Sequence, residues 1–554
     1  MIAWHKDLHL KRSREIASVL FSHGWEALIE NFKPARIGRF RNHVKERTAA
    51  LNRAEHLRSA FEELGTTFIK LGQILSTRAD LLPPEYLAEL TKLQDSAPEF
   101  PFKLVEQTLV AELGRPLDDI FLQFDREPLA AASIGQAHAA IMHDGTEVVV
   151  KIRRPRVVEQ VNEDLEILKE LAATTSRHWE FADQYDLIGL VEEFSETLRA
   201  ELDYIREAHN VEHFAANFAD DPAIHIPRVF WQTTTPQVLT LERIRGIKIN
   251  DIQGLDEQGT DRRWLAEYAT GVVLKMVCED GLFHADPHPG NFFIEENGTI
   301  GLIDFGMVGI IDERTQQNLA DLLIAINQQD ADRLVDVFLD LGVTKKRIDR
   351  ALLRRDIKHL LSTYWGLPLS ELKISALLNE VFEAMRRHRL HLPSNLALLL
   401  KTVIMIEGLG VTLDPEFHLS MVLAPYADKL VLQQYSPLRW IRGLGRASLD
   451  LARLGSDMPQ QLRRIVSAAE GGNFQIGMRP EGFDPVINRL ERISNRIVLG
   501  VIAAAFINGL AVLVSVYRPP GWEQWAWVVF AFGFFCALML GLYLALSILR
   551  SRAR

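Results

Sequence analysis

The sequence predicts an α+β protein with two lobes, a helical extension before them and two transmembrane helices after them. Three observations support this prediction. Apolar residues recur at helical spacing before residue 82; a small-residue loop, a hairpin and an apolar strand follow; and two long uncharged runs lie near the C-terminus. The expected divisions are a helical extension over 1–100, an N-lobe over 101–241, a C-lobe over 242–435, a membrane-proximal linker over 436–496 and two transmembrane helices over 497–549.

Composition excludes several classes of protein. Hydrophobic residues make up 47% and charged residues 24% of the 554 positions, which is close to the globular average and excludes a disordered chain. The net charge of −11 excludes a protein that coats nucleic acid, so no nucleic-acid partner is expected. The two cysteines, Cys278 and Cys536, exclude a disulfide framework and a Cys-rich zinc site, and they fit a reducing compartment.

The extension is expected to contain one long helix. Apolar residues at three- and four-residue spacing predict a helix over His56–Leu82, and Pro83-Pro84 is expected to end it. Lys70 and Gln73 lie on one side of this helix, but their spacing alone does not separate a functional site from a solvated face. The basic stretch 31–50 before it fits either a helix lying on anionic lipid or a solvated helix face.

The N-lobe begins with residue types that favour strands, beyond Pro101. Pro128–His138 is a loop of small residues, His143–Gly145 is a hairpin-turn signal, and 148–152 is an apolar strand. That strand carries a single lysine, Lys151. This layout resembles the N-lobe of a protein kinase, in which the loop covers the ATP phosphates and the lysine holds the α- and β-phosphates.

A lysine on an interior strand needs an anion to offset the cost of removing its charge from water. The segment Arg199–Ala208 is predicted to be helical and carries three acids, Glu201, Asp203 and Glu207. One of them is expected to pair with Lys151, and Glu201 is the favoured candidate. The alternative is that all three acids are solvated.

The chemistry of the site is indicated by two motifs in the C-lobe. The segment His284–Asn291 fits the kinase catalytic-loop pattern H-x-D-x4-N, and Asp304–Gly306, an Asp-Phe-Gly triplet, follows thirteen residues after it. In kinases the loop aspartate lies at the accepting hydroxyl, while the asparagine and the second aspartate hold two Mg²⁺ ions. The motifs therefore predict ATP as the nucleotide, Asp286 as a catalytic residue, and Asn291 and Asp304 as magnesium ligands.

These features together predict a two-lobed, protein-kinase-like fold with two departures from ordinary kinases. Ala130–Ala132 stand where kinases have glycines, so the backbone should lie farther from the phosphates. After Gly306 the chain is expected to enter a helix over 315–327, which leaves no room for an activation segment. A zinc site at His284 and His288 is the alternative, but further His or Cys ligands are missing.

The motifs resemble those of the UbiB family of atypical kinase-like proteins, also called the AarF or ADCK group, and the bacterial members above all. The resemblance implies an ATPase or atypical phosphotransferase with a role in ubiquinone or other prenylquinone biosynthesis. It implies membrane lipids and prenylated quinone precursors as partners, with other quinone-biosynthesis enzymes as further candidates. The segments that carry it are Phe68–Arg78, Ala130–Gln136, Glu201–Asp203, His284–Asn291 and the paired C-terminal runs.

The resemblance also implies functional residues that spacing does not reveal. It places the Lys-x-Gly-Gln helix over the active site, where a protein substrate would lie, so Lys70 and Gln73 join Asp286 as expected catalytic residues. The nucleotide contacts that it implies are Leu129, Ala130, Ala131, Ala132, Ser133, Ile134, Gly135, Gln136, Ala137, Lys151, Glu201 and Glu242.

The C-terminal half is expected to be helical and then to enter a membrane. Within the C-lobe, Leu398–Gly408 is predicted to be an apolar helix that ends at its glycine. Ile497–Val516 and Trp525–Leu549 are uncharged, and each is long enough to cross a ~30 Å hydrocarbon core as a helix. Arginines flank both ends of this hairpin, which predicts a bacterial cytoplasmic membrane protein with its kinase-like lobes facing the cytoplasm.

Three functions fit the sequence. An enzyme that hydrolyses ATP or phosphorylates a small molecule in quinone-lipid synthesis is favoured. A protein kinase is disfavoured, because the missing activation segment removes the platform on which a peptide would bind. An ATP-gated scaffold for quinone-biosynthesis enzymes would need nucleotide binding but little turnover.

Overall fold

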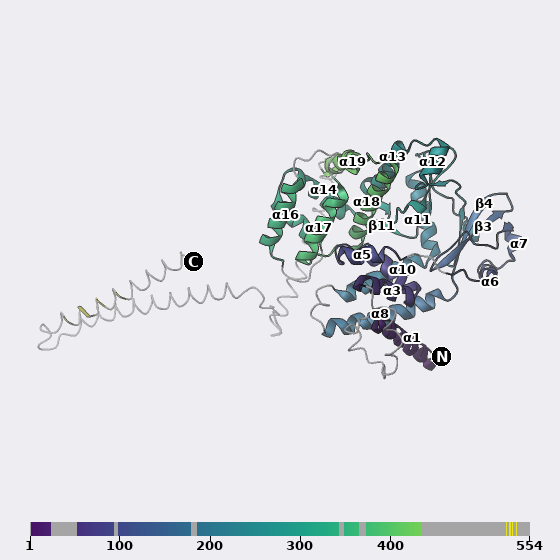
Figure 1. The fold of residues 1–554 in the computed structure, drawn as a ribbon, viewed down its shortest axis with the longest axis horizontal. Helices are drawn as coiled ribbons and strands as arrows, with labels where there is room; N and C mark the ends of the chain where they lie inside the picture. Colours follow the sequence, from purple (N-terminus) through teal and green to yellow (C-terminus); the bar gives the residue numbers. More distant parts are fainter. Residues whose placement is uncertain are drawn as a thin grey trace, which may run out of the picture. The chain divides into compact units, whose positions relative to one another are not determined.

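The computed structural model describes most of the chain before residue 435 (Figure 1). The chain divides into two units, 1–442 and 443–554, and the fold below is that of the first. The basic stretch 31–50, the linker 436–496 and both predicted transmembrane helices lie outside the described residues, apart from five helical positions in the second one. The described residues are 2–23, 52–93, 98–178, 186–342, 348–364, 373–434, 528, 531, 532, 535 and 539.

The N-lobe is built on a five-stranded antiparallel sheet in the order β1-β3-β4-β6, and β2 also pairs with β3, along the same edge as β1. The predicted hairpin is confirmed, since β3 and β4 pair with Ala137 opposite Lys151. Val148, Val150 and Ile152 alternate into the core, so Lys151 points to the opposite face. The strands are β1 (Phe121–Phe124), β2 (Ala130–Ala131), β3 (Gly135–Met142), β4 (Glu147–Arg153) and β6 (Val238–Glu242).

Helices occupy two places where the sequence suggested otherwise. Two helices, α6 (Phe102–Leu113) and α7 (Leu117–Ile120), come before the first strand, so the expectation of strands directly after Pro101 was wrong. The predicted helix over Arg199–Ala208 is broken, because Asp203 accepts a hydrogen bond from the Ile205 amide at 3.1 Å and starts a new helix. The other N-lobe helices are α8 (Val157–His178), α10 (Leu187–Glu201) and α11 (Tyr204–Asn217).

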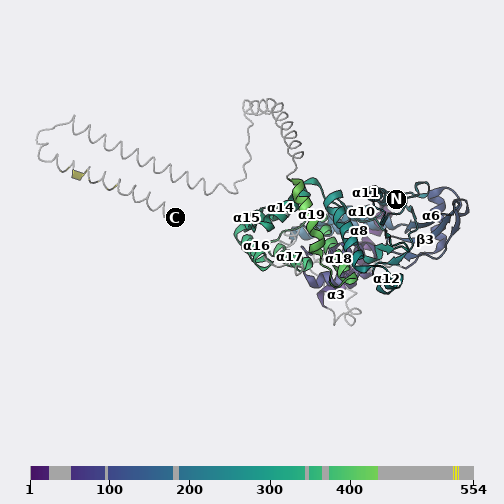
Figure 2. The same cartoon turned by 90° about the horizontal axis from the view of Figure 1, so that it is seen from above.

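The C-lobe combines short strands with a large helical core. One sheet has the order β5-β10-β9-β7, and β8 pairs with β11 in a second sheet. In both views the N-lobe sheet and the helices α14 to α17 lie at opposite ends of this unit, with α10 and α11 between them (Figures 1 and 2). The strands are β5 (Ile224–His225), β7 (Ile247–Lys248), β8 (Leu282–His284), β9 (Phe292–Ile294), β10 (Ile300–Leu302) and β11 (Val308–Ile310).

The C-lobe helices confirm the predicted helical character of this half. The expected helix over 315–327 is α14, which begins two residues earlier than predicted. The helices are α12 (Ile252–Gln258), α13 (Arg262–Lys275), α14 (Glu313–Asn327), α15 (Ala331–Leu341), α16 (Arg350–Tyr364), α17 (Ile374–His388), α18 (Ser394–Leu413) and α19 (Leu419–Gln434).

The extension contains several helices rather than one long helix over 56–82. Gly65 has a φ of +87°, a conformation that residues with a side chain rarely adopt, and it separates α3 from α4. Pro84 does not end a helix but starts one, at the first helical position, where its missing N–H costs no hydrogen bond. The helices are α1 (Ile2–Ser22), α3 (Arg53–Leu64), α4 (Thr66–Ser76) and α5 (Pro84–Leu90).

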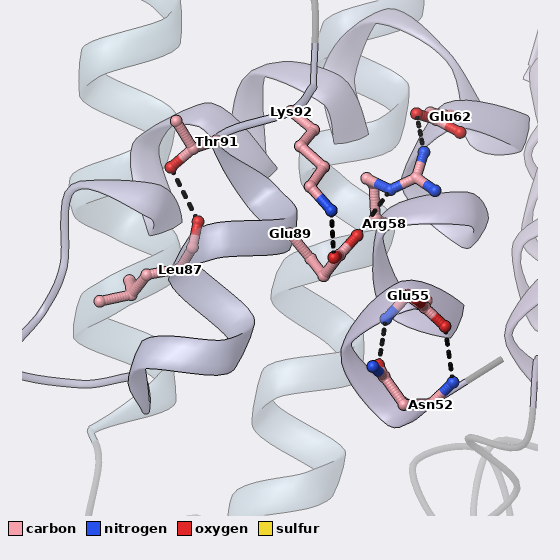
Figure 3. A network of polar contacts seen from close by, with 8 residues as sticks. All are labelled: Asn52, Glu55, Arg58, Glu62, Leu87, Glu89, Thr91 and Lys92. Carbon is pink, nitrogen blue, oxygen red and sulfur yellow. Dashed lines mark hydrogen bonds and ion pairs between the residues drawn. The ribbon is translucent and has the colours of Figure 1, made fainter.

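Polar contacts hold α3 against α5 within the extension (Figure 3). Asn52 and Glu55 form a capping box at the start of α3, with hydrogen bonds of 2.9 and 2.8 Å. Arg58 of α3 donates to Glu89 of α5 at 3.1 Å, and Lys92 pairs with the same carboxylate. These contacts fix the two helices that flank α4, which carries the Lys-x-Gly-Gln motif.

A buried ion pair joins the extension to both lobes. Arg78 is 3% exposed and donates twice to Asp80, at 2.9 and 2.8 Å. The same guanidinium donates to Glu193 of α10 and to the Leu392 carbonyl between α17 and α18. The Leu392 amide in turn donates to Asp80 at 2.9 Å. The turn after α4 is therefore held between the N-lobe and the helical end of the C-lobe.

Helix α18 runs past the glycine at which we expected it to end. It extends from Ser394 to Leu413 and contains Gly408 and Gly410. Gly410 serves packing, because a Cβ there would lie 2.3 Å from ring atoms of Phe417. Among the described residues, α18 is the one helix long and apolar enough to cross a membrane, but half of it is buried in the C-lobe. Its packing against α13 and α17 makes it a core helix.

The two glycines of α18 should respond oppositely to alanine. Gly410→Ala is expected to cost about 1–3 kcal/mol of unfolding free energy, because Phe417 must move. Gly408→Ala, with no neighbouring atom within 4 Å of its Cβ, should stabilise the protein by about 0.5–1 kcal/mol. Urea unfolding of both variants measures the difference. Equal effects would contradict the packing of Phe417 on α18.

Candidate functional site

Three charged side chains meet between the lobes, around Lys151. Its ammonium lies 2.6 Å from a carboxylate oxygen of Glu207 and 3.6 Å from Oδ1 of Asp304. Glu207 belongs to α11, which starts at Asp203. The expectation that an acid of this region pairs with Lys151 is confirmed, but the favoured candidate, Glu201, was wrong. The helix break at Asp203 is the reason, because it puts Glu201 and Glu207 on different helices.

The three charges of the cluster, on Lys151, Glu207 and Asp304, shift one another's pKa values. Burial opposes the charge of Lys151, but Asp304 and Glu207 together outweigh it and raise the pKa of the lysine above its usual value. Lys151 in turn holds the pKa of Asp304 at about 2, so this carboxylate is ionised at neutral pH. Burial raises the pKa of Glu207, Lys151 opposes that rise, and the like charge of Asp304 adds to it.

A glycine allows α11 to approach the sheet closely enough for this contact. A Cβ on Gly135 would lie 2.4 Å from the Ile152 carbonyl oxygen and 2.6 Å from the hydroxyl oxygen of Tyr204. Tyr204 is the first residue of α11, and it is buried against β3 and β4. Glu207 follows one turn later and therefore faces Lys151 across the same gap.

Asp304 is held in an uncommon backbone conformation by its neighbours. Its φ is +64°, a region that Asn and Asp tolerate better than other side chains. Phe305 is fully buried and packs against the rings of Phe214 and His284 at 5.0 and 5.5 Å. The amide of Asn210 donates to the Phe305 carbonyl at 2.9 Å. The anchored phenylalanine thus leaves the preceding aspartate side chain exposed to the site.

The catalytic loop is organised by hydrogen bonds within itself. His284 is buried; its Nδ1 accepts from the Asp286 amide at 3.2 Å, and its Nε2 lies 3.2 Å from the Ile303 carbonyl oxygen. Asn291 donates its side-chain amide to the Asp286 carbonyl at 3.0 Å, and its own carbonyl accepts from the Ile303 amide at 3.0 Å. The loop therefore lies directly beside Asp304, as the two motifs predict. His284 has a structural role in it.

Sequence reasoning missed one residue that contacts the loop. Lys401 of α18 lies 3.1 Å from Oδ1 of Asp286. The signal that could have identified it is a lone basic residue within the apolar run Leu396–Ile406. The sequence predicts only an apolar helix here, because nothing local links it to a loop more than a hundred residues away.

The Lys-x-Gly-Gln helix reaches the site through one of its two polar residues. Lys70 lies 3.3 Å from Glu201, and both side chains are largely buried. Its charge also contributes, after those of Lys151 and His284, to lowering the pKa of Asp304. Gln73 instead donates its amide to the Leu93 carbonyl at 3.3 Å, within the extension. The structure thus brings Lys70 toward Asp304 and engages Gln73 elsewhere.

The alanine-rich loop divides into an exposed half and a buried half. Leu129 and Ala130 are exposed, and Ala131, Ala132 and Ala137 are partly exposed. The other four residues of the loop are buried. These residues are Ser133, Ile134, Gly135 and Gln136.

Gln136 and Glu242 have protein partners of their own. The side chain of Gln136 exchanges hydrogen bonds with the backbone of Phe100 and contacts His138 at 2.9 Å. The side chain is thus hydrogen-bonded within the N-lobe, and the role of Gln136 as a nucleotide contact stays a prediction. Glu242 ends β6, beside β4, and accepts from the Arg228 amide at 3.1 Å. It lies at the connection between the lobes, where its role as a nucleotide contact stays a prediction.

The site fits magnesium and a nucleotide by the chemistry of its donors. Asp304 is ionised, and Asn291 presents an amide oxygen from the adjoining loop; hard oxygen ligands of this kind suit Mg²⁺. Lys151 supplies a positive charge on the same side. Among the described residues, no group of three or more His, Cys, Asp or Glu side chains could hold a metal alone. The zinc alternative at His284 thus gains no support there.

The chain leaves the site without an activation segment, as predicted. Directly after Gly306 it forms β11, in which Val308 lies opposite His284 of β8. Helix α14 then begins at Glu313, capped by Asp312. From Val308 onward the chain forms β11 and then α14 of the C-lobe. The described chain therefore lacks a peptide-binding platform of the kind found in protein kinases.

Comparison with known families gives three matches along the chain. The model of the ABC1 atypical kinase-like domain matches residues 92–338. The model of the UbiB helical domain matches residues 357–418, which include α18. The model of the ABC1/UbiB kinase-like C-terminal domain matches residues 481–550.

Similar proteins occur in bacteria and in plants. A protein encoded in the hydrogenase 1 5′ region of Clostridium pasteurianum is 34% identical over 90% of this chain and 93% of its own. The probable protein kinase UbiB of Xanthomonas euvesicatoria is 32% identical over 93% and 96%. The chloroplastic protein ACTIVITY OF BC1 COMPLEX KINASE 7 of Arabidopsis thaliana is 33% identical over 85% and 68%. A solved Rv3197–erythromycin complex from Mycobacterium tuberculosis is 25% identical, with a TM-score of 0.44, over 67% and 94%.

Proposed function

Because the chain belongs to the UbiB family of ABC1-type atypical kinase-like proteins, we propose that it hydrolyses ATP in support of ubiquinone or another prenylquinone synthesis. The observation that carries the proposal is the cluster of Lys151, Glu207 and Asp304 beside the loop that holds Asp286. A lysine that pairs with a buried glutamate, next to an ionised aspartate open to the site, is the arrangement expected where a nucleotide and its metal are bound.

The residues have separable roles in the proposed reaction. Lys151 binds the α- and β-phosphates, and Asp304 and Asn291 hold Mg²⁺, which neutralises charge on the phosphates when bound. The oxygen of a water molecule attacks the γ-phosphorus, the bond to the β,γ-bridging oxygen breaks, and ADP leaves with that electron pair. Asp286 lies where it can accept the proton of the attacking water and pass it to solvent.

The geometry favours water or a small acceptor over a protein substrate. The strand β11 and helix α14 replace the segment on which a peptide would lie. Lys70 of the extension lies close enough to Asp304 to lower its pKa, so α4 stands on the same side of the site. The Arg78–Asp80 pair fastens that extension to both lobes, which restricts access further.

Phosphate release from ATP tests the hydrolysis. The wild-type protein should release phosphate in a Mg²⁺-dependent manner, and Asp286→Asn should reduce turnover about 10²–10⁴-fold while nucleotide binding persists. Asp332→Asn, which removes an exposed surface acid of α15, is the matched control and should turn over normally. Nucleotide binding without any release by the wild type would contradict hydrolysis and favour an ATP-gated scaffold.

The proposed membrane anchoring rests on the sequence of the C-terminal region. Two uncharged runs, 497–516 and 525–549, lie within the segment that matches the family's C-terminal domain. Prenylated quinone precursors are themselves confined to a bilayer, so an enzyme that serves them gains from being held there. The same argument supports the proposed location in a bacterial cytoplasmic membrane, with the lobes on the cytoplasmic side.

A chain that ends at Asn488 should bind Mg-nucleotide normally and lose most of its stimulation by anionic liposomes. The physical reason is that the hairpin no longer holds basic linker residues at the lipid surface, where each contributes about 1 kcal/mol. Phosphate release with and without cardiolipin-containing vesicles measures this for both chains. Equal stimulation of the two would show that the hairpin only localises the protein. The linker arginines are Arg439, Arg442, Arg446 and Arg453.

A further inference from the structure

Helix α18 carries a lysine, Lys401, whose ammonium reaches the site and has no role in the reaction proposed above. Its sequence, Ser394–Leu413, carries two charged residues, Lys401 and Glu407. Glu407 is structural, because its carboxylate accepts from the Ile374 and Ser375 amides at 2.9 and 2.7 Å and so caps α17. Lys401, by contrast, contacts the catalytic loop and does not cap a helix.

The partner of Lys401 is the carboxylate of the catalytic loop. Its ammonium lies 3.1 Å from Oδ1 of Asp286, and the two side chains are 23% and 37% exposed. The pair is therefore open to the site rather than sealed in the core. A lysine in an otherwise apolar helix loses hydration, and this contact offsets part of the loss.

The other lysines of the site are committed elsewhere. Lys151 is paired with Glu207 and Asp304, and Lys70 is paired with Glu201. The catalytic loop from His284 to Asn291 contains no lysine or arginine. A γ-phosphate placed next to Asp286 would meet a negative carboxylate, and the cation that the structure provides at that carboxylate is Lys401.

We propose that Lys401 binds the γ-phosphate of ATP and holds it beside Asp286, an inference that rests on the proposed ATP-handling function. An ammonium has three donors, so it can contact a phosphate oxygen while it keeps the Asp286 carboxylate. It thereby reduces the repulsion between that carboxylate and the phosphate, and it stabilises charge on the γ-phosphoryl oxygens as the bond to ADP breaks. The UbiB helical domain then contributes directly to the active site.

Nucleotide discrimination tests this role without depending on turnover. Isothermal titration of the full chain with Mg-ATP and Mg-ADP should show weaker ATP binding by about tenfold in Lys401→Met, with ADP binding unchanged. Lys401→Arg should retain most of the preference for ATP, because it keeps the charge. Lys429→Met is the matched control, since it removes a lysine from the neighbouring helix α19 that pairs with Glu279 at the surface.

The outcomes separate this inference from the function on which it rests. Loss of the ATP preference in Lys401→Met alone supports the γ-phosphate contact. Equal weakening of ATP and ADP, or no change in either, would overturn it and leave Lys401 as a structural partner of Asp286, while the wild type still binds ATP. If the wild type binds neither nucleotide, the proposed function fails first and this inference fails with it.

Discussion

Asp304→Asn is expected to abolish Mg²⁺-dependent nucleotide binding while the protein stays folded. The pKa of about 2 means that the wild-type side chain is fully ionised at neutral pH, and the substitution removes that charge from the metal. The fold should tolerate the change, because the side chain is 55% exposed and asparagine accepts the positive φ of this position. Thermal unfolding with and without Mg-ATP measures the effect, since a ligand that binds only the folded state raises the midpoint.

The control for this substitution is again Asp332→Asn, which changes the net charge by the same amount at the surface. Its midpoint should rise with Mg-ATP as that of the wild type does. A rise of wild-type size in Asp304→Asn would contradict the assignment of Asp304 as a metal ligand.

Lys151→Met should lose nucleotide binding and also destabilise the fold, by about 3 kcal/mol. The second effect arises because Glu207, 7% exposed, is left beside Asp304 without its cation. Burial already raises the pKa of Glu207, and loss of the lysine raises it further. A carboxyl group whose pKa is higher in the folded than in the unfolded protein destabilises the fold at a pH above that folded pKa, where folding forces it to stay charged or to bind a proton. Below the pKa of the unfolded state it is protonated in both states and costs nothing. The variant should therefore regain stability as the pH falls and Glu207 takes up a proton.

The double variant Lys151→Met/Glu207→Gln separates the two effects. A neutral amide at position 207 needs no cation, so stability should largely return while nucleotide binding stays lost. Urea unfolding at several pH values, together with nucleotide titration, measures both. Unchanged nucleotide affinity in Lys151→Met would reject the phosphate role of the lysine, whatever its stability.

The parts of the site that could be predicted are those that follow from local patterns. The turn at His143–Gly145 and the alternation of buried and exposed residues in β4 are short-range signals. They correctly place Lys151 on a strand of the N-lobe sheet, on the face opposite the buried valines. The two C-lobe motifs also lie close in sequence. The short antiparallel strands β9 and β10 between them bring Asn291, at the end of the first motif, next to Ile303, just before the second.

The choice among the three acids could not be made from the same patterns. A continuous helix through Asp203 would have placed Glu201 and Glu207 on the same helix, and the helix propensities of these residues favour that interpretation. Hydrogen bonding of the Asp203 side chain to the Ile205 amide overrides it and starts α11. Capping is a local event, but whether a mid-segment aspartate caps or continues a helix depends on the packing around it.

Other features depend on contacts that are distant in sequence. Gly408 is a predicted helix stop, yet α18 continues to Leu413, and the next glycine, Gly410, makes room for the ring of Phe417. Lys401 meets Asp286 across 115 positions, so no spacing could reveal the pair. The side chain of Gln136 is turned inward by the backbone of Phe100, which the small residues around it did not indicate.

The most direct test of the central claim, that this kinase-like site drives quinone synthesis, is the quinone content of cells. Cells that lack the protein should be supplied with the wild type, Asp304→Asn or Asp332→Asn at equal protein level, and their quinones and prenylated precursors should be measured by mass spectrometry. We expect the wild type and Asp332→Asn to restore the quinone, and Asp304→Asn cells to accumulate the same early precursor as cells without the protein. Full restoration by Asp304→Asn would contradict the account.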